Sequence, residues 1–119
     1  MSEVPTSQIV LCIDDHTSSL VLRRIILENA GFSVLTAETA TAGLALLRQS
    51  QVNLAIVDYF LPDMDGTALA TEIKALRPEL KVLMLSGTIE EPGMRSIDAF
   101  LTKGGTTKEF LQVVHKLIG

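Results

Sequence analysis

Several ingredients that define other protein classes are scarce in this chain of 119 residues. It has one cysteine, Cys12, so no disulfide can form within the chain and a disulfide-stapled secreted scaffold is excluded. With only two histidines beside that cysteine, the sequence also argues against a tetrahedral zinc site. Proline (4) and glycine (8) are few, whereas 47% of the residues are hydrophobic. These values exclude disordered, collagen-like and low-complexity classes and leave enough apolar side chain for a packed core.

Positive charge and long apolar runs are scarce as well. Ten Lys and Arg stand against fourteen Asp and Glu, for a net charge of −4 and a pI near 5.0, which argues against direct contact with nucleic acid or anionic lipid. No apolar run approaches the length of a membrane span, and the first eight residues are mostly polar, so we expect neither a signal peptide nor a membrane helix. A mass of 12.9 kDa predicts a single domain over residues 1–119, with a cytoplasmic location as the expectation.

What the chain does contain is a regular alternation of short apolar runs with amphipathic segments. This alternation is typical of repeated βα units around a parallel sheet with helices on both faces. The apolar runs are continuous because such strands are buried on both sides. The sequence therefore predicts an α/β fold with five strands, at residues 9–13, 32–36, 54–57, 82–85 and 100–101.

Apolar stripes at helical spacing predict about five helices between and after these strands. The first is expected to bury Leu22, Ile26 and Ala30 and to end at Gly31. The other long stripes are Ala40, Leu44 and Leu47, then Leu69, Ile73 and Leu76, and finally Phe110, Val114 and Leu117 after a Thr106–Glu109 capping box. Between residues 86 and 99, glycines and a proline interrupt the pattern, so at most a short fourth helix fits there.

Polar side chains follow the strands where the expected sheet would bind a ligand. In an open parallel sheet, ligands bind outside the carboxyl ends of the strands. The residues at those ends are Asp14 and Asp15 after the first strand, Asp58 after the third, Ser86 after the fourth and Lys103 after the fifth. We expect three carboxylates, one hydroxyl and one ammonium to converge on this edge.

Three carboxylates at one sheet edge repel one another unless a cation relieves the repulsion. Their hard oxygen atoms suit magnesium or manganese, and Lys103 alone carries too little charge to balance them. Asp58 ends the central strand, so we assign it as a nucleophile toward phosphorus that forms an aspartyl phosphate. The metal and Lys103 would neutralise charge on the phosphoryl oxygens, and Ser86 would donate a hydrogen bond.

Each of these residues also has an ordinary structural interpretation. Asp14 and Asp15 suit a helix N-cap, Asp58 and Ser86 suit turns, and Lys103 suits a solvated loop. Taken singly, these interpretations are at least as common as the functional ones, and only the joint placement favours a site. Other conspicuous residues are interpreted as packing or surface residues: Phe100 as core, Cys12 as a small buried hydrophobe, and His16 and His115 as surface or capping histidines.

The ordered set of motifs resembles the receiver domain of bacterial two-component response regulators over nearly the whole chain. The residues that carry the resemblance are Asp14–Asp15, Asp58 followed by Pro62 and Gly66 at plus four and plus eight, Ser86–Gly87, Phe100 and Lys103. The resemblance implies a doubly wound, flavodoxin-like parallel sheet of strand order 2-1-3-4-5. It also implies a signalling domain, not an enzyme in its own right, whose partner is a sensor histidine kinase or a histidine phosphotransfer protein.

The same resemblance implies roles for individual residues. Asp58 would accept the phosphoryl group from a phosphohistidine, and Lys103 would pair with it. Asp15, Asp58 and the backbone carbonyl of Phe60 would bind magnesium directly, and Asp14 through water. Ser86 would move toward the phosphoryl group, and Phe100 would turn into the space released. In physical terms, a new dianion would bias a two-state element.

Three departures from the family pattern shape further expectations. Gly104–Gly105 follows Lys103 where the family usually has a proline, and the segment from residue 86 to 100 is short, which shrinks the fourth helix. Phe60 lies two residues after Asp58, where a side chain screens attacking water, so we predict slow self-dephosphorylation. On the first helix, Val21 and Ile25 are hypothesised to form part of a kinase-docking face.

Two rival interpretations come from other classes. Residues 63–67 spell the D-x-D-G-T signature of haloacid-dehalogenase-type phosphatases, with Asp63 and Asp65 as the catalytic pair, but Pro62 precedes the first of them and the strand ends at Asp58. The second rival is a receiver-like module that signals by protein contact without phosphorylation. The short fourth helix and the missing proline favour it, and the full set of acidic, hydroxyl and ammonium groups argues against it.

Overall fold

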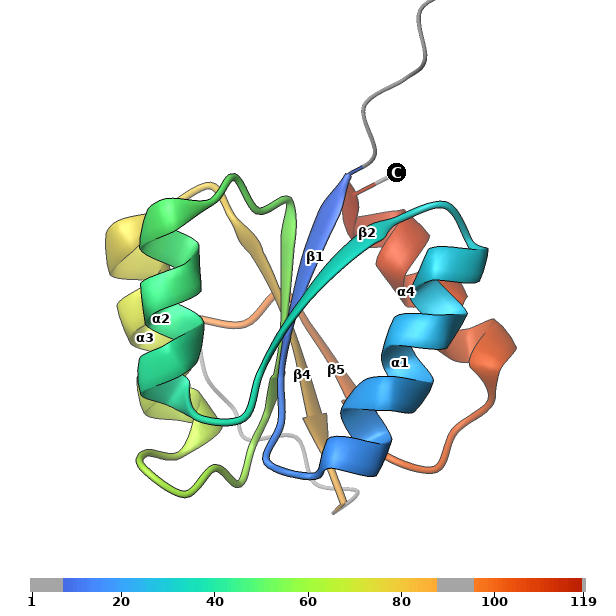
Figure 1. The fold of residues 1–119 in the computed structure, drawn as a ribbon, viewed down its shortest axis with the longest axis horizontal. Coiled ribbons are helices and arrows are strands. Elements are labelled where there is room, and N and C mark those ends of the chain that lie inside the picture. The colour runs from blue at the N-terminus through green and yellow to red at the C-terminus, as the bar shows by residue number, and fades with distance from the viewer. Residues whose placement is uncertain (1–7, 88–95, 119) are drawn as a thin grey trace, which may run out of the picture.

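The computed structural model describes residues 8–87 and 96–118, which form a five-stranded parallel sheet of order β2-β1-β3-β4-β5 (Figure 1). The strands are β1 (Ile9–Ile13), β2 (Ser33–Ala37), β3 (Leu54–Asp58), β4 (Lys81–Ser86) and β5 (Ala99–Thr102). Neighbouring strands pair in parallel throughout. The predicted α/β fold and its strand order are confirmed. Most strand ends lie one residue away from their expected positions.

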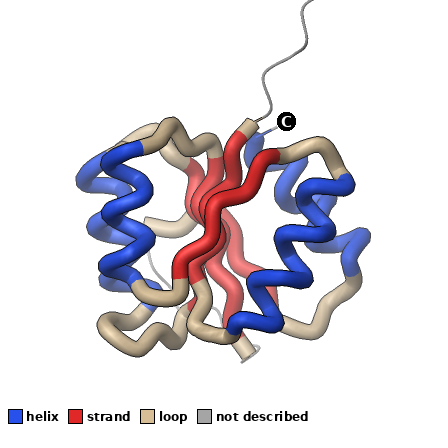
Figure 2. Tube along the Cα trace, viewed as in Figure 1, coloured by secondary structure: helices blue, strands red, loops and turns tan. Residues whose placement is uncertain are grey.

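Four described helices cover the two faces of the sheet: α1 (Thr17–Asn29), α2 (Ala40–Gln49), α3 (Gly66–Leu76) and α4 (Thr107–Ile118). Figures 1 and 2 show α2 and α3 on one face and α1 and α4 on the other. The short helix expected between residues 86 and 99 falls mainly on residues 88–95, which lie outside the described residues. None of the four helices reaches the length and hydrophobicity that crossing a bilayer needs.

The sheet separates two apolar cores. Alternate residues of each strand point to opposite faces, so Leu11 and Ile13 pack toward α2 and α3, whereas Val10 and Cys12 pack toward α1 and α4. Burial raises the pKa of the Cys12 thiol to about 12, in keeping with its expected role as a small hydrophobe. Each large apolar side chain fully buried in this way contributes about 1.5–3 kcal/mol.

Helix α1 packs through a different stripe from the one expected. Leu20 and Leu27 are its buried residues, and Leu22, which we expected inside, is 59% exposed. The buried line runs through Leu20, Arg23 and Leu27, because residues three and seven apart share one face of a helix. Arg23 is a charged residue within an otherwise apolar stripe, and its side chain is only 12% exposed. The expected helix end is confirmed, since Gly31 adopts a φ of +99° just past α1.

The ends of α3 and α4 agree with their sequence signals more closely than the buried stripe of α1 does. The Thr106–Glu109 capping box is confirmed: Glu109 N donates to Thr106 Oγ1 at 3.1 Å, and Thr106 N donates to Glu109 Oε1 at 3.1 Å. Helix α3 buries Leu69 and Ile73 as expected and ends at Leu76, which is 40% exposed.

A tight approach between α3 and β3 fixes the loop that follows Asp58. A Cβ atom at Gly66 would lie 2.7 Å from the backbone oxygen of Asp58, so only glycine fits there without a shift. Gly66 N donates to the Tyr59 carbonyl at 2.6 Å, and Phe60 and Asp65 form an isolated antiparallel bridge. The loop therefore folds back onto the carboxyl end of β3.

Candidate functional site

The carboxyl ends of β1, β3 and β5 bring the predicted charged residues together at one edge of the sheet. Asp14 follows β1 directly, Asp58 is the last residue of β3, and Lys103 follows β5. Asp14 and Asp58 are buried, whereas the side chain of Asp15 is 39% exposed. In the view of Figure 1 this edge lies at the bottom, where β1 leads into α1.

Lys103 bridges the two buried carboxylates. Its Nζ lies 3.0 Å from Asp14 Oδ2 and 3.1 Å from Asp58 Oδ1. Burial raises the pKa of Asp58 above its usual value, and the hydrogen bond from Lys103 only partly offsets this. Burial acts in the same direction on Asp14. There, hydrogen bonds from His16 N, Arg23 and Lys103 outweigh it, and the pKa of Asp14 lies below its usual value.

Gly104, next to Lys103, has a φ of +93°. Proline cannot adopt this conformation because its ring holds φ near −65°. The glycine that replaces the proline expected after Lys103 therefore gives this loop a different backbone, and the described peptide bonds are all trans.

Arg23 is a member of this cluster that the sequence did not reveal. Its Nη1 donates to Asp14 Oδ2 at 2.8 Å from the buried face of α1. The only signal in the sequence was a basic residue in the helical stripe of Leu20 and Leu27, which an apolar pattern overlooks.

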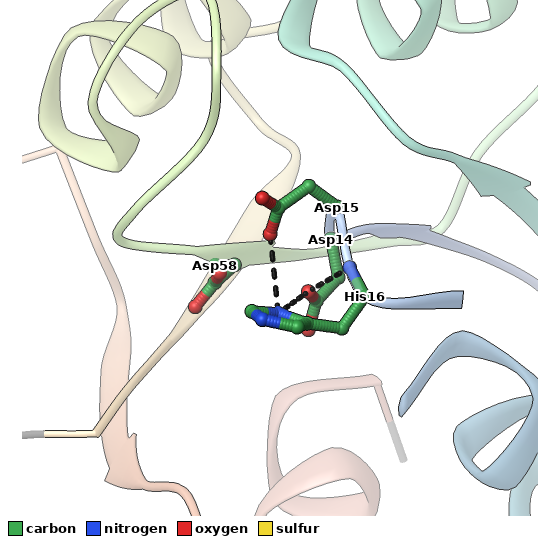
Figure 3. Close-up of side chains that lie close together, drawn as sticks. All are labelled: Asp14, Asp15, His16 and Asp58. Atoms are coloured by element: carbon green, nitrogen blue, oxygen red, sulfur yellow. Dashed lines mark hydrogen bonds and ion pairs between the residues drawn. The ribbon is translucent and has the colours of Figure 1, made fainter. Parts of the chain in front are cut away.

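His16 was interpreted as a surface or capping residue, and it occupies the N-cap position of α1 without a side-chain cap. Figure 3 shows its ring against the acidic pair: Nδ1 lies 3.2 Å from Asp14 Oδ1 and 3.2 Å from Asp15 Oδ1. His16 N also donates to Asp14 Oδ1 at 2.9 Å. Ligand atoms of Asp14, Asp15, His16 and Asp58 all lie within 4.8 Å of one another, a separation at which one metal ion could be held.

Ser86 and Phe100, the two predicted switch residues, lie on the neighbouring strands β4 and β5. Ser86 is buried at the end of β4, and its carbonyl accepts a hydrogen bond from Lys103 N at 2.7 Å. Phe100 pairs with Met84 in the sheet and packs, half-buried, against the core under α2 and α3. Since Ser86 lies two residues after Met84, both predicted switch residues point toward that core.

Phe60 stands at the rim of the site, two residues after Asp58. It is 60% exposed, and its ring forms a T-shaped pair with the Tyr59 ring at a centroid distance of 4.7 Å. Its backbone pairs with Asp65, which places its carbonyl in the folded-back loop after β3.

Asp63 and Asp65, the pair in the phosphatase-like signature, are engaged elsewhere. Asp63 accepts hydrogen bonds at 2.9 Å from Ala40 N and Thr41 N, at the start of α2. Asp65 is the N-cap of α3 and accepts from Ala68 N at 2.8 Å and from the Thr67 hydroxyl. Both carboxylates therefore cap helices, and the geometry does not support the phosphatase interpretation.

A groove of about 260 Å³ runs beside the site between α1 and the loop from β5 to α4. Arg23 and Lys103 line the end nearest the carboxylates, and Leu22, Ile26 and Phe110 line its apolar part. Space next to both cationic side chains is therefore available on this side of the site.

Comparison with known proteins agrees with this arrangement. The response regulator receiver domain family matches residues 10–115, and the chain belongs to that family, a signalling domain of two-component systems. A response regulator receiver domain protein from Methanospirillum hungatei is similar in structure, with a TM-score of 0.88 and 32% identity over 93% of each chain.

Among curated proteins, the chain is 34% identical to the transcriptional regulatory protein GlrR of Escherichia coli over 79% of its own length and 22% of that protein. It is 30% identical to the sensor protein GacS of Pseudomonas syringae over 92% of its own length and 13% of that protein. The chain thus spans less than a quarter of the length of these relatives, which include both a regulator and a sensor.

Proposed function

We propose that this receiver domain, residues 1–119, accepts a phosphoryl group on Asp58 from a phosphohistidine of a sensor kinase or phosphotransfer protein. A carboxylate oxygen of Asp58 would form the new P–O bond while the P–N bond to the imidazole breaks, and the imidazole leaves as the product. The observation that carries this proposal is the placement of Asp58, buried at the centre of the sheet edge with Lys103 Nζ 3.1 Å from Oδ1.

Lys103 would act as the cation for the phosphoryl oxygens. Its ammonium already lies between two carboxylates, and a side chain with rotatable bonds can turn from Asp14 to a new dianion without backbone movement. Ser86, the last residue of the neighbouring strand β4, would donate a hydrogen bond to the same group.

The acidic cluster suits a hard divalent cation, and we propose magnesium. Asp15, Asp58 and the Phe60 carbonyl would bind it directly, with Asp14 acting through water. Oxygen ligands are the ones magnesium prefers, so the His16 ring is not assigned as a ligand. When bound, the ion would neutralise charge on the transferring phosphoryl group.

Conformational coupling would run through Ser86 and Phe100. Phe100 packs against the core under α2 and α3, strand alternation assigns Ser86 to the same face of the sheet, and strand β5 connects Phe100 with Lys103. A shift of Ser86 toward a phosphoryl group would open room on the side where Phe100 packs. A charge at Asp58 would thereby change a surface on the other side of the sheet.

The exposed side of α1 is the proposed docking face. Val21, Leu22 and Ile25 are 52%, 59% and 50% exposed, an apolar surface on the helix that starts beside the acidic pair. The groove next to Leu22 reaches Lys103, and the ammonium of Lys103 contacts Asp58, so a histidine partner bound there would lie near the proposed acceptor. Replacing Val21 and Ile25 with Lys is expected to weaken phosphotransfer from the partner. It should leave phosphorylation by acetyl phosphate unchanged, because that small donor needs no docking face.

The experiment that tests the proposed acceptor uses beryllofluoride, an acyl-phosphate mimic, with magnesium. Tyr59 is the single tyrosine and the chain has no tryptophan, so intrinsic fluorescence reports on the residue next to Asp58. The wild type and Asp63→Asn are expected to change fluorescence on addition, and Asp58→Asn is not. A response that survives Asp58→Asn would contradict the proposal. No response in any of these proteins would favour a module that signals by contact alone.

The cytoplasmic location of the protein stays a prediction.

A further inference from the structure

Asp14 is the most heavily engaged carboxylate of the site. Both of its oxygens have donors: His16 N at 2.9 Å on Oδ1, and Arg23 Nη1 at 2.8 Å and Lys103 Nζ at 3.0 Å on Oδ2. The side chain is fully buried. A divalent cation that approaches this end of the sheet therefore meets a carboxylate whose oxygens are already taken.

The charges of the cluster are already close to balance without a divalent ion. Asp14, Asp15 and Asp58 contribute three negative charges, and Arg23 and Lys103 contribute two positive ones. Lys103 is the cation expected from the sequence, but Arg23 is an addition from α1. A divalent ion would be repelled by a guanidinium held at the same carboxylate, since a low-dielectric site strengthens interactions between like charges.

The groove gives the Arg23 side chain a place to move. Arg23 lies at the junction between Asp14 and the groove between α1 and the β5–α4 loop. A rotation of its side chain into this space would break its bond to Asp14 Oδ2 and leave Lys103 as the cation on that oxygen, without breaking a backbone hydrogen bond of α1. The Asp14–Arg23 pair can thus open while the fold stays intact.

We propose that Arg23 is a positioning residue that competes with magnesium for Asp14 and thereby sets the affinity of the site for the ion. This inference rests on the proposed magnesium-dependent function. When no ion is bound, the guanidinium of Arg23 balances part of the negative charge of the carboxylates. Binding of the ion requires the guanidinium to share or release Asp14. The domain would consequently bind magnesium more weakly than the same set of carboxylates without Arg23.

Arg24 offers a matched control next in the chain. It carries the same charge, but it is 47% exposed and its contacts are Val34 O at 3.4 Å and Glu28 Oε2 at 3.8 Å. Arg24→Gln therefore changes the net charge as Arg23→Gln does, without touching Asp14. Arg23→Gln keeps a side-chain amide donor for Asp14, and Arg23→Lys restores the charge.

The test is the dissociation constant of Mg²⁺ for the full chain, measured by isothermal titration calorimetry, with thermal unfolding by circular dichroism to verify each fold. We expect Arg23→Gln to bind Mg²⁺ about 10-fold more tightly, as removal of one positive charge a few ångström from the ion implies. Arg24→Gln should change the constant by less than about 3-fold, because solvent screens an exposed charge. Arg23→Lys should return the affinity toward that of the wild type.

Three results would overturn the inference alone. Two of them concern Arg23→Gln: a dissociation constant for Mg²⁺ equal to that of the wild type, or weaker binding than in the wild type. An equal tightening in Arg24→Gln would also overturn it, because net charge would then account for the effect. Wild type that binds no Mg²⁺ at millimolar concentration would instead overturn the proposed magnesium-dependent function, and the inference with it. If Arg23→Gln fails to fold, Arg23→Met is measured under the same conditions with the same expected tightening.

Discussion

Two pairs of aspartates within one molecule differ in the groups that donate hydrogen bonds to them. Asp63 and Asp65 receive backbone N–H groups at the starts of α2 and α3. Asp14 and Asp58 share the ammonium of Lys103, and Asp14 also binds the guanidinium of Arg23 in addition to one backbone donor, His16 N. The first pair is exposed and the second is buried.

The difference separates carboxylates that stabilise helix ends from carboxylates whose bound cations can be exchanged. A backbone N–H at a helix start is fixed in place by the helix, so the hydrogen bonds of Asp63 and Asp65 stabilise the ends of α2 and α3. A lysine or arginine side chain can rotate away, so the buried pair can exchange its cations for a metal ion or a phosphoryl group. The type of donor, more than the number of acidic residues, thus indicates which pair serves the proposed chemistry.

The largest effect should come from removing the shared cation. Lys103→Met is expected to lower the rate of Asp58 phosphorylation by acetyl phosphate by about 100-fold, because one fixed donor to the transferring group is lost. Time courses of phosphoprotein formation measure this rate. Lys108→Met, which alters an exposed lysine at the start of α4, is the control and should match the wild type. Equal rates for both variants would remove Lys103 from the proposed site.

A smaller effect is expected from the structural pair. Asp63→Asn should lower the free energy of unfolding by about 1 kcal/mol, the usual cost of weakening a helix cap, and leave phosphorylation intact. Urea denaturation monitored by circular dichroism measures the first quantity. If Asp63→Asn instead abolishes phosphorylation while the fold persists, the two pairs are not separate in function.

The same variant predicts a change in pH dependence. Hydrogen bonds from Thr41 and Ala40 lower the pKa of Asp63 from 3.8 to about 2. A depressed folded-state pKa stabilises the fold at pH values above 3.8, and this contribution is lost as the pH falls from 3.8 toward 2. The stability difference between wild type and Asp63→Asn should therefore shrink over that window. A difference that stays constant from pH 5 to pH 2 would show that the Asp63 carboxylate is not charged in its cap.

The smallest effect concerns the rim of the buried pair. Phe60 is largely exposed beside Asp58, and its ring is proposed to screen the phosphoryl group from attacking water. Phe60→Ala should shorten the lifetime of phosphorylated Asp58 severalfold without changing the rate at which it forms. Loss of the phosphoryl group after removal of acetyl phosphate measures this lifetime. A wild-type lifetime of only seconds with magnesium, or no change in Phe60→Ala, would contradict the screening role.

Much of the fold could be predicted from the sequence because its signals are local. Strand β1 was predicted with its observed bounds, and the stripe of α2 through Ala40, Leu44 and Leu47 is buried as expected. The ends of parallel strands share one edge of a sheet, so the placement of Asp14 and Asp58 together followed from the strand pattern alone.

The features that sequence analysis missed depend on contacts between distant segments or on a charged residue in a buried stripe. Leu22 was expected to be buried, but α1 instead directs Arg23 toward Asp14 and leaves Leu22 exposed in the lining of the groove. A pattern of apolar residues cannot predict which face of α1 is buried, because it does not take account of an arginine whose partner follows a strand. The cap that Asp63 places on α2 joins residues 22 and 23 positions apart, beyond the reach of any local capping signal.

The most direct test of the central claim is the intact mass of the protein after incubation with acetyl phosphate and magnesium. We predict that the wild type and Asp63→Asn each gain the mass of one phosphoryl group, and that Asp58→Asn gains none. A gain that persists in Asp58→Asn, or one that depends on Asp63 in its place, would contradict the assignment of the buried pair as the phosphoacceptor site.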